Sequence, residues 1–231
     1  MTIDPALEPD LRRLIAHVLE VNRSFNLTAI RDENEAWTKH ILDSLQGLST
    51  GLFEGEKQVI DIGSGAGFPG LPLAIVRPQL KVVLLDATRK KCDFLTATAA
   101  DFSPRTRVIC DRAETIGHRV EWRERFAVAT MRAVGSMSEA CELAMPLIKI
   151  GGHAVLWRGT WAVEEAAAMK RVLAILGGEV RDVTPYKLEN LPPTYHLIVV
   201  EKTHSTPVEL PRRDGLPKHE PLVSFSPPGH P

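Results

Sequence analysis

The spacing of apolar residues changes along the chain. Residues 5–22 carry apolar side chains at helical spacing (Leu7, Leu11, Leu14, Ile15, Val18 and Leu19), and Pro5 suits a first helical turn. A second helix is predicted over residues 34–46. Beyond Gly47, short apolar runs alternate with helical stretches. The runs predict strands at Val59–Ile62, Val82–Leu85, Arg107–Cys110, Phe126–Met131 and, after a turn at Gly151-Gly152, His153–Trp157; the helices between them are Pro69–Val76, Arg89–Ala100, Met137–Ile148 and Val163–Leu176.

This alternation predicts an α/β fold with right-handed crossovers and a mainly parallel sheet. The last two runs, Glu179–Tyr186 and Tyr195–Lys202, have no helix between them and predict a terminal antiparallel pair. A sheet that ends in this way is typical of class I methyltransferases. We therefore expect a Rossmann-like, seven-stranded, mainly parallel sheet with helices on both faces. Residues 1–48 would be a helical segment packed on the core, residues 49–203 the main domain, and residues 204–231 an extended, proline-rich basic tail, disordered from about Ser224.

Composition limits the kinds of partner. Of 231 residues 44% are hydrophobic and 25% charged, as in ordinary globular proteins, and the net charge is −1. A nucleic-acid partner would therefore need a local basic patch. Cys92, Cys110 and Cys141 have no CxxC spacing, so neither a disulfide framework nor a metal site is expected. There is no signal peptide and no apolar run of ~20 residues, which predicts a cytoplasmic protein.

The strongest motif is a glycine loop that follows a predicted strand. It runs from Asp61 through Gly63, Gly65 and Gly67 to Gly70, and its glycines let a ligand approach the backbone. The spacing also fits the dinucleotide pattern of NAD-dependent dehydrogenases. Asp61, however, would repel a pyrophosphate, whereas it suits the sulfonium and ammonium groups of S-adenosylmethionine (SAM).

Two further acids end the next strands. Asp86 closes the second strand and could accept hydrogen bonds from ribose hydroxyls. Glu114 follows the third strand, where an adenine ring would lie. The alternative is that these acids only cap the helices that follow them. The charge pattern as a whole favours SAM.

The segment expected to face the acceptor, Thr130–Val134, carries no motif for methylation of an exocyclic amine. No cysteine is placed to attack carbon 5 of cytosine. A ring nitrogen such as guanine N7 has a lone pair and no proton, so it needs no general base. Positioning alone could then supply the catalysis, with no metal.

Several segments together resemble the RsmG family (also called GidB) of bacterial 16S rRNA guanine-N7 methyltransferases. They are Asn22–Ile30, Lys39–Leu45, Asp61–Pro72, Leu85-Asp86 with Lys90-Lys91, Arg112–Glu114 and Arg132–Val134, and the likeness extends to about Leu222. The resemblance implies methylation at the guanine-527 position and SAM contacts from Gly63, Phe68, Ala113, Glu114 and Arg132. One departure is Arg158, where the family usually has lysine.

Candidate contacts to 16S rRNA or the small subunit come from several segments. They are Asn26, His40, Arg158, Arg212, Arg213 and Lys218. Arg132 is the candidate catalytic residue, which could orient the cofactor carboxylate or a phosphate of the target; its alternative is a structural ion pair with Asp61 or Glu114. For His40 the alternative is a satisfied polar cluster. The tail arginines have no evident packing role, so we expect the tail to bind RNA and not to affect SAM affinity.

Three other functions remain open for a chain that we expect to be a monomer. The first is a SAM-dependent methyltransferase with another acceptor, and the second is a NAD-dependent dehydrogenase. The third is a ribosome-assembly factor without catalytic activity.

Overall fold

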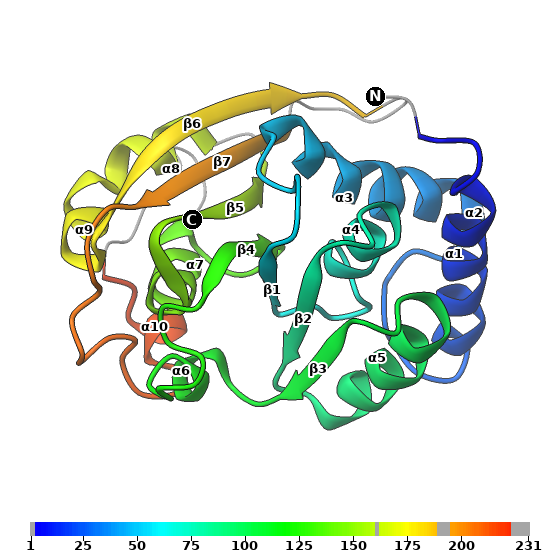
Figure 1. Ribbon diagram of the computed structural model, residues 1–231, viewed down its shortest axis with the longest axis horizontal. Helices are drawn as coiled ribbons and strands as arrows, with labels where there is room; N and C mark the ends of the chain where they lie inside the picture. Colours follow the sequence, from blue (N-terminus) through cyan, green and yellow to red (C-terminus); the bar gives the residue numbers. More distant parts are fainter. Residues whose placement is uncertain (1–2, 160–161, 189–194, 223–231) are drawn as a thin grey trace.

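The computed structural model describes residues 3–159, 162–188 and 195–222. Its centre is one seven-stranded sheet in the order β3-β2-β1-β4-β5-β7-β6 (Figure 1). The strands are β1 (Gln58–Ile62), β2 (Lys81–Asp86), β3 (Arg107–Cys110), β4 (Phe126–Arg132), β5 (Ile148–Arg158), β6 (Gly178–Tyr186) and β7 (Tyr195–Lys202). β1 to β5 are parallel to one another, and β7 is antiparallel to both β5 and β6. The predicted fold class is confirmed, including the terminal antiparallel pair.

Helices cover both faces of the sheet. The N-terminal part contains α1 (Glu8–Asn22), α2 (Glu33–Ala36), the π-helical turn η1 (Trp37–Leu42), α3 (Asp43–Leu45) and η2 (Gln46–Thr50). The later helices are α4 (Gly70–Val76), α5 (Arg89–Phe102), α6 (Ala113–Ile116), α7 (Met137–Ala144), η3 (Met145–Leu147), α8 (Ala162–Ala168), α9 (Lys170–Leu176) and α10 (Leu216–His219). No helix in the described ranges is long and apolar enough to cross a membrane.

Two hydrophobic clusters fill the space between the sheet and its helices. Successive strand residues alternate between them: Val59 belongs to one cluster, and Ile60 belongs to the other. The cluster of Val59 also contains the buried faces of α1, α4 and α5, and the cluster of Ile60 contains those of α7 and α9. A parallel sheet covered on both faces needs strands that are apolar throughout, which explains why its strands are continuous apolar runs in the sequence.

The predicted helix over residues 34–46 is interrupted by η1. In this turn the N–H of Asp43 donates to the carbonyls of Thr38 and His40 and not to that of Lys39. The Lys39 carbonyl is then free to accept a hydrogen bond from Arg132 at 2.8 Å. Such π-helical turns often lie at functional sites, and this one faces a cavity described below.

Three other expectations need correction. β5 begins at Ile148 and passes through Gly151-Gly152, which is a bulge at a register shift rather than a turn. The helix predicted over Val163–Leu176 is two helices that meet at Met169. The tail is not simply extended: residues 203–222 run across the molecule to α10, next to α6 and α7 (Figure 1). The disorder expected from Ser224 onward lies outside the described residues.

Candidate active site

Two cavities lie at the carboxyl ends of the parallel strands, where ligands bind in sheets of this kind. The first, here called the glycine-loop cavity, has a volume of about 400 Å³. The second, the aromatic cavity, has a volume of about 340 Å³. Ala133, which directly follows β4, lines both of them.

Acidic side chains line the glycine-loop cavity together with the glycine loop. Its wall contains Ile62, Gly63, Leu85, Asp86, Ala87, Lys91, Asp111, Arg112, Ala113, Glu114, Ala133, Val134, Gly135, Glu139, Leu143 and Lys218. Four of these residues are acidic and three are basic. A ligand with both signs of charge suits such a wall, whereas a pyrophosphate would face four carboxylates.

Asp86 ties the glycine loop to the end of β2. Its Oδ2 accepts a hydrogen bond from the Gly65 N–H at 3.0 Å, and its Oδ1 accepts one from the Thr88 N–H at 2.8 Å. Gly63 and Gly65 have φ values of 71° and 59°, which glycine adopts without a steric penalty. The loop is therefore ordered by a residue that also lines the cavity.

Asp61 also holds the glycine loop, through hydrogen bonds to its carboxylate. Its Oδ1 accepts a hydrogen bond from the Thr130 hydroxyl at 2.8 Å, and its Oδ2 accepts one from the Gly70 N–H at 3.1 Å. The residue is 1% exposed, and burial raises the pKa of its carboxyl to about 6. Asp61 does not line the glycine-loop cavity. Its contacts shape the loop, and a direct contact with a cofactor stays a prediction.

Glu114 receives hydrogen bonds from two parts of the chain. Its Oε1 accepts one from the Arg112 guanidinium at 2.9 Å and one from the Gly215 N–H at 2.8 Å. Burial opposes ionisation of this carboxyl, but these donors outweigh it, and the pKa of Glu114 lies below its usual value. Glu139 is different: burial, with the nearby charge of Glu114, raises its pKa.

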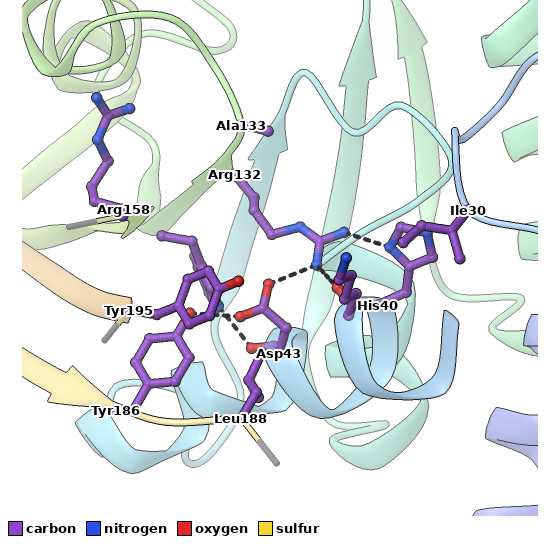
Figure 2. Close-up of a pocket in the computed structure, with 12 residues that line it drawn as sticks. Ile30, His40, Asp43, Arg132, Ala133, Arg158, Tyr186, Leu188 and Tyr195 are labelled. Atoms are coloured by element: carbon purple, nitrogen blue, oxygen red, sulfur yellow. Dashed lines mark hydrogen bonds and ion pairs between the residues drawn. The ribbon is translucent and has the colours of Figure 1, made fainter. Parts of the chain in front are cut away.

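Arg132 extends from the end of β4 into the wall of the aromatic cavity, between the N-terminal helices and β6 (Figure 2). One of its terminal nitrogens donates to the Lys39 carbonyl at 2.8 Å and to Asp43 Oδ2 at 2.9 Å. The other lies 3.2 Å from His40 Nδ1. The Tyr186 hydroxyl donates to Asp43 Oδ1 at 2.6 Å. Arg132 thus makes an ion pair, but with Asp43 and not with the acids that the sequence suggested.

His40 is neutral in this network. Burial, followed by the nearby charge of Arg132, lowers its pKa to about 3. Because Nδ1 accepts from the Arg132 guanidinium, the proton is on Nε2, which donates to the Thr28 hydroxyl at 2.9 Å. The His40 ring stacks on Phe68 with centroids 4.5 Å apart. Phe68 lines neither cavity. It supports His40 through this stacking contact.

The wall between the cavities has a strained backbone and is held in place by an arginine. Ala133 has a φ of 55°, a conformation that costs a residue with a side chain roughly 1–2 kcal/mol. Arg158, at the end of β5, donates to the carbonyls of Val134 at 3.1 Å and Gly135 at 2.9 Å. Its guanidinium also pairs with both carboxylate oxygens of Glu165, at 2.9 and 2.7 Å. In Figure 2 the Arg158 side chain points away from Arg132 and its hydrogen-bond partners. Its guanidinium therefore holds the wall between the cavities and is not directed into the aromatic cavity.

The remaining predicted residues lie in different places. Asn26 is exposed, outside both cavities, and accepts a hydrogen bond from Arg31 at 3.2 Å. Arg212 pairs with the fully buried Glu142, so the expectation that this arginine has no packing role is wrong. Arg213 is exposed. Lys218 lines the glycine-loop cavity, so the tail does not stand apart from the predicted cofactor site.

Gly67 also lies outside the cavity. A Cβ on Gly67 would collide with the side chain of Leu71, so its absence lets the loop pack on α4. Sequence reasoning missed Glu139, Tyr186 and Tyr195. The first had a local signal, since Ser136 caps the helix and accepts from the Glu139 N–H at 3.1 Å, which fits the helix-start pattern. The two tyrosines had none.

The chain matches known proteins over most of its length. The family model for "rRNA small subunit methyltransferase G" matches residues 7–192. The chain is 43% identical to a protein of Synechococcus elongatus over 220 residues (94% of this chain, 91% of the relative) and 42% identical to one of Gloeobacter violaceus over 211 residues (91% and 84%). Both relatives are named ribosomal RNA small subunit methyltransferase G.

The fold is also similar to solved structures. One is a 16S rRNA (adenine(1408)-N(1))-methyltransferase from Catenulisporales acidiphilia with cosubstrate SAM. Its TM-score is 0.53 at 14% identity, covering 70% of this chain and 92% of that one.

Proposed function

Because the chain belongs to the rRNA small subunit methyltransferase G family, we propose that it transfers a methyl group from SAM to N7 of a guanosine in 16S rRNA. The guanosine would be at the guanine-527 position, which the family resemblance suggested. The enzyme acts in the cytoplasm as a monomer, on the rRNA or the small ribosomal subunit. One observation carries this proposal: two cavities of different chemistry meet at Ala133.

The glycine-loop cavity is the SAM site. Bound there, SAM supplies an electrophilic methyl group on a sulfonium. Asp86 is placed to accept hydrogen bonds from ribose hydroxyls, and the backbone at Gly63 and Ala113 lines the same wall. Asp61 and Gly65 keep the loop in shape through their hydrogen bonds. The mixed charges of the wall fit a zwitterionic nucleoside and disfavour the pyrophosphate of NAD.

The aromatic cavity is the site of the guanine. Tyr186 and Tyr195, whose rings stack with centroids 5.8 Å apart, give it an aromatic wall, against which a base can pack. Arg132 brings a positive charge to it, which suits a base or phosphate of the RNA. Two exposed residues outside the cavities, Asn26 and Arg213, stay candidates for contacts to the RNA backbone.

Among the described residues that line the aromatic cavity, the histidine, the carboxylate and the lysine are all engaged in contacts within the protein. His40 has both ring nitrogens in hydrogen bonds, and both oxygens of Asp43 accept from Arg132 and Tyr186. Lys39 is paired with Glu35 at 2.7 Å. Guanine N7 needs no base, because its lone pair is in the ring plane and it carries no proton. The residues therefore catalyse by holding the base edge-on at Ala133 and excluding water.

An acceptor RNA with one changed atom tests the proposal. Reconstituted small-subunit particles would carry either guanosine or 7-deazaguanosine, which has C–H in place of N7, at the target position. Labelled methyl should pass from SAM to the first particle and not to the second. Equal labelling of both would show that the acceptor is another atom. Binding of the particle without any transfer would favour the assembly factor.

A further inference from the structure

The C-terminal strap, here residues 203–222, is bound firmly to the body of the protein. Arg123 donates to three of its carbonyls, those of Leu210 at 2.8 Å, Thr206 at 2.7 Å and Pro207 at 2.9 Å. At its start the buried ammonium of Lys202 donates to the Thr206 hydroxyl at 2.6 Å. The strap is thus part of the folded structure.

A buried ion pair fixes the middle of the strap. The carboxylate of Glu142, on α7, is fully buried. It accepts from the Arg212 backbone N–H at 2.9 Å and from the Arg212 guanidinium at 2.8 and 2.7 Å. A buried charge without a partner is costly, so the pair fixes the register of the strap on α7.

The strap then reaches the glycine-loop cavity. Gly215, with a φ of 79°, directs its N–H to Glu114 Oε1. Beside it, the Thr115 hydroxyl donates to Asp214 Oδ1 at 3.3 Å. A left-handed residue at this point turns the chain into α10, and Figure 1 shows α10 beside α6. The strap therefore reaches the edge of the cavity at α6 and α7, and one of its residues, Lys218, lines the cavity.

Lys218, on α10, lines the cavity. In the described ranges no hydrogen bond or ion pair joins its ammonium to the protein, although its charge acts on Glu139. Glu114, which follows β3, and Glu139, on α7, line the same cavity, and the charges of Lys218 and Glu114 both act on Glu139. We expect the adenine ring beside the carboxylate that follows the third strand. The strap bonds to this carboxylate, Glu114, through the Gly215 N–H, three residues before Lys218.

We propose that the strap is the outer wall of the cofactor site and that Lys218 binds the nucleoside part of SAM, by donating a hydrogen bond to an acceptor on the adenine or ribose. This inference rests on the proposed function. In this inference the strap helps to bind the cofactor. The alternative is that its basic residues bind RNA.

Binding measurements without RNA separate these assignments. Calorimetry would give the Kd of SAM and of 5′-methylthioadenosine, which has the nucleoside and no amino-acid part. Lys218→Ala should weaken both ligands by the same factor, about tenfold for one charge-assisted hydrogen bond. The control Lys170→Ala removes an exposed lysine of α9 and should leave both constants unchanged.

Each other outcome has a distinct meaning. Unchanged binding of both ligands by Lys218→Ala would overturn the inference, and so would weaker binding of SAM alone, which would place the ammonium on the carboxylate. If both ligands bound Lys218→Ala unchanged and a separate titration with rRNA showed weaker binding, the strap would be an RNA-binding element. Failure of the unaltered protein to bind SAM would instead refute the proposed function.

Discussion

Replacing Arg132 by alanine should lower both stability and methyl transfer, for different reasons. In the native protein the side chains of Arg132 and Asp43 are only 14% and 12% exposed. Arg132→Ala leaves the Asp43 carboxylate with the Tyr186 hydroxyl as a donor. Breaking a buried pair from one side costs about 3–5 kcal/mol, and the slight exposure here favours about 3 kcal/mol. Most of the protein should stay folded, since domains of this kind are stable by ~5–15 kcal/mol.

A second substitution separates stability from catalysis. Asp43→Asn, added to Arg132→Ala, removes the charge that has lost its partner and should restore most of the ~3 kcal/mol. It cannot restore the guanidinium at the aromatic cavity, so transfer should stay at least 100-fold below that of the unaltered protein, as for misplaced substrates.

Urea denaturation gives the stability of the single and double variants, and labelled methyl transfer gives their activity. The reasoning would be refuted if the double variant were no more stable than Arg132→Ala. A double variant that regained transfer would show that only the integrity of the fold matters at this position. Full activity of Arg132→Ala would remove the catalytic role.

The same contacts give three more predictions. Because the pKa of His40 is about 3 in the folded protein, against an ordinary value of 6.5 in the unfolded chain, the unfolded chain binds more protons between these values. His40 should therefore make stability fall below pH 6.5 by up to ~1.4 kcal/mol per pH unit, whereas Asp61, whose pKa is raised to about 6, acts in the opposite direction below pH 6. The contribution of His40 is the difference between the urea denaturation of the unaltered protein and that of His40→Gln, which should lack the fall that His40 causes. Arg212→Ala strands the buried Glu142 and should lower the denaturation free energy by about 3–5 kcal/mol, partly recovered in a double variant with Glu142→Gln. Arg158→Lys keeps the charge but loses the bidentate pairing with Glu165. Methyl transfer should then show a kcat roughly tenfold lower, with little change in KM for SAM. Equal kcat values would show that Arg158 does not hold the wall between the cavities.

Local patterns predicted the sheet well because its strands are buried on both faces. Val59–Ile62 and Val82–Leu85 are apolar runs with clear ends in buried strands, and the glycine loop marks one strand end. The interruption at η1 could not be predicted, because the freed Lys39 carbonyl is satisfied by Arg132, 93 residues away. The bulge in β5 similarly depends on its register with β4.

The candidate site was predicted at the level of positions but not of partners. Asp86 and Glu114 line the predicted cavity, since residues at parallel strand ends meet at one edge of the sheet. The partner of Arg132 was missed, because Asp43 comes from a helix whose packing no local pattern encodes. The tail was interpreted from its charges, and charge alone does not reveal that Arg212 faces a buried carboxylate.

The central claim is that this chain methylates guanine N7 in small-subunit rRNA. Its most direct test is transfer of labelled methyl from SAM to small-subunit rRNA or particles from a strain that lacks this gene, followed by identification of the labelled nucleoside. We expect the label in 7-methylguanosine at one position. Label in another nucleoside, or no transfer by a protein that binds SAM, would contradict it.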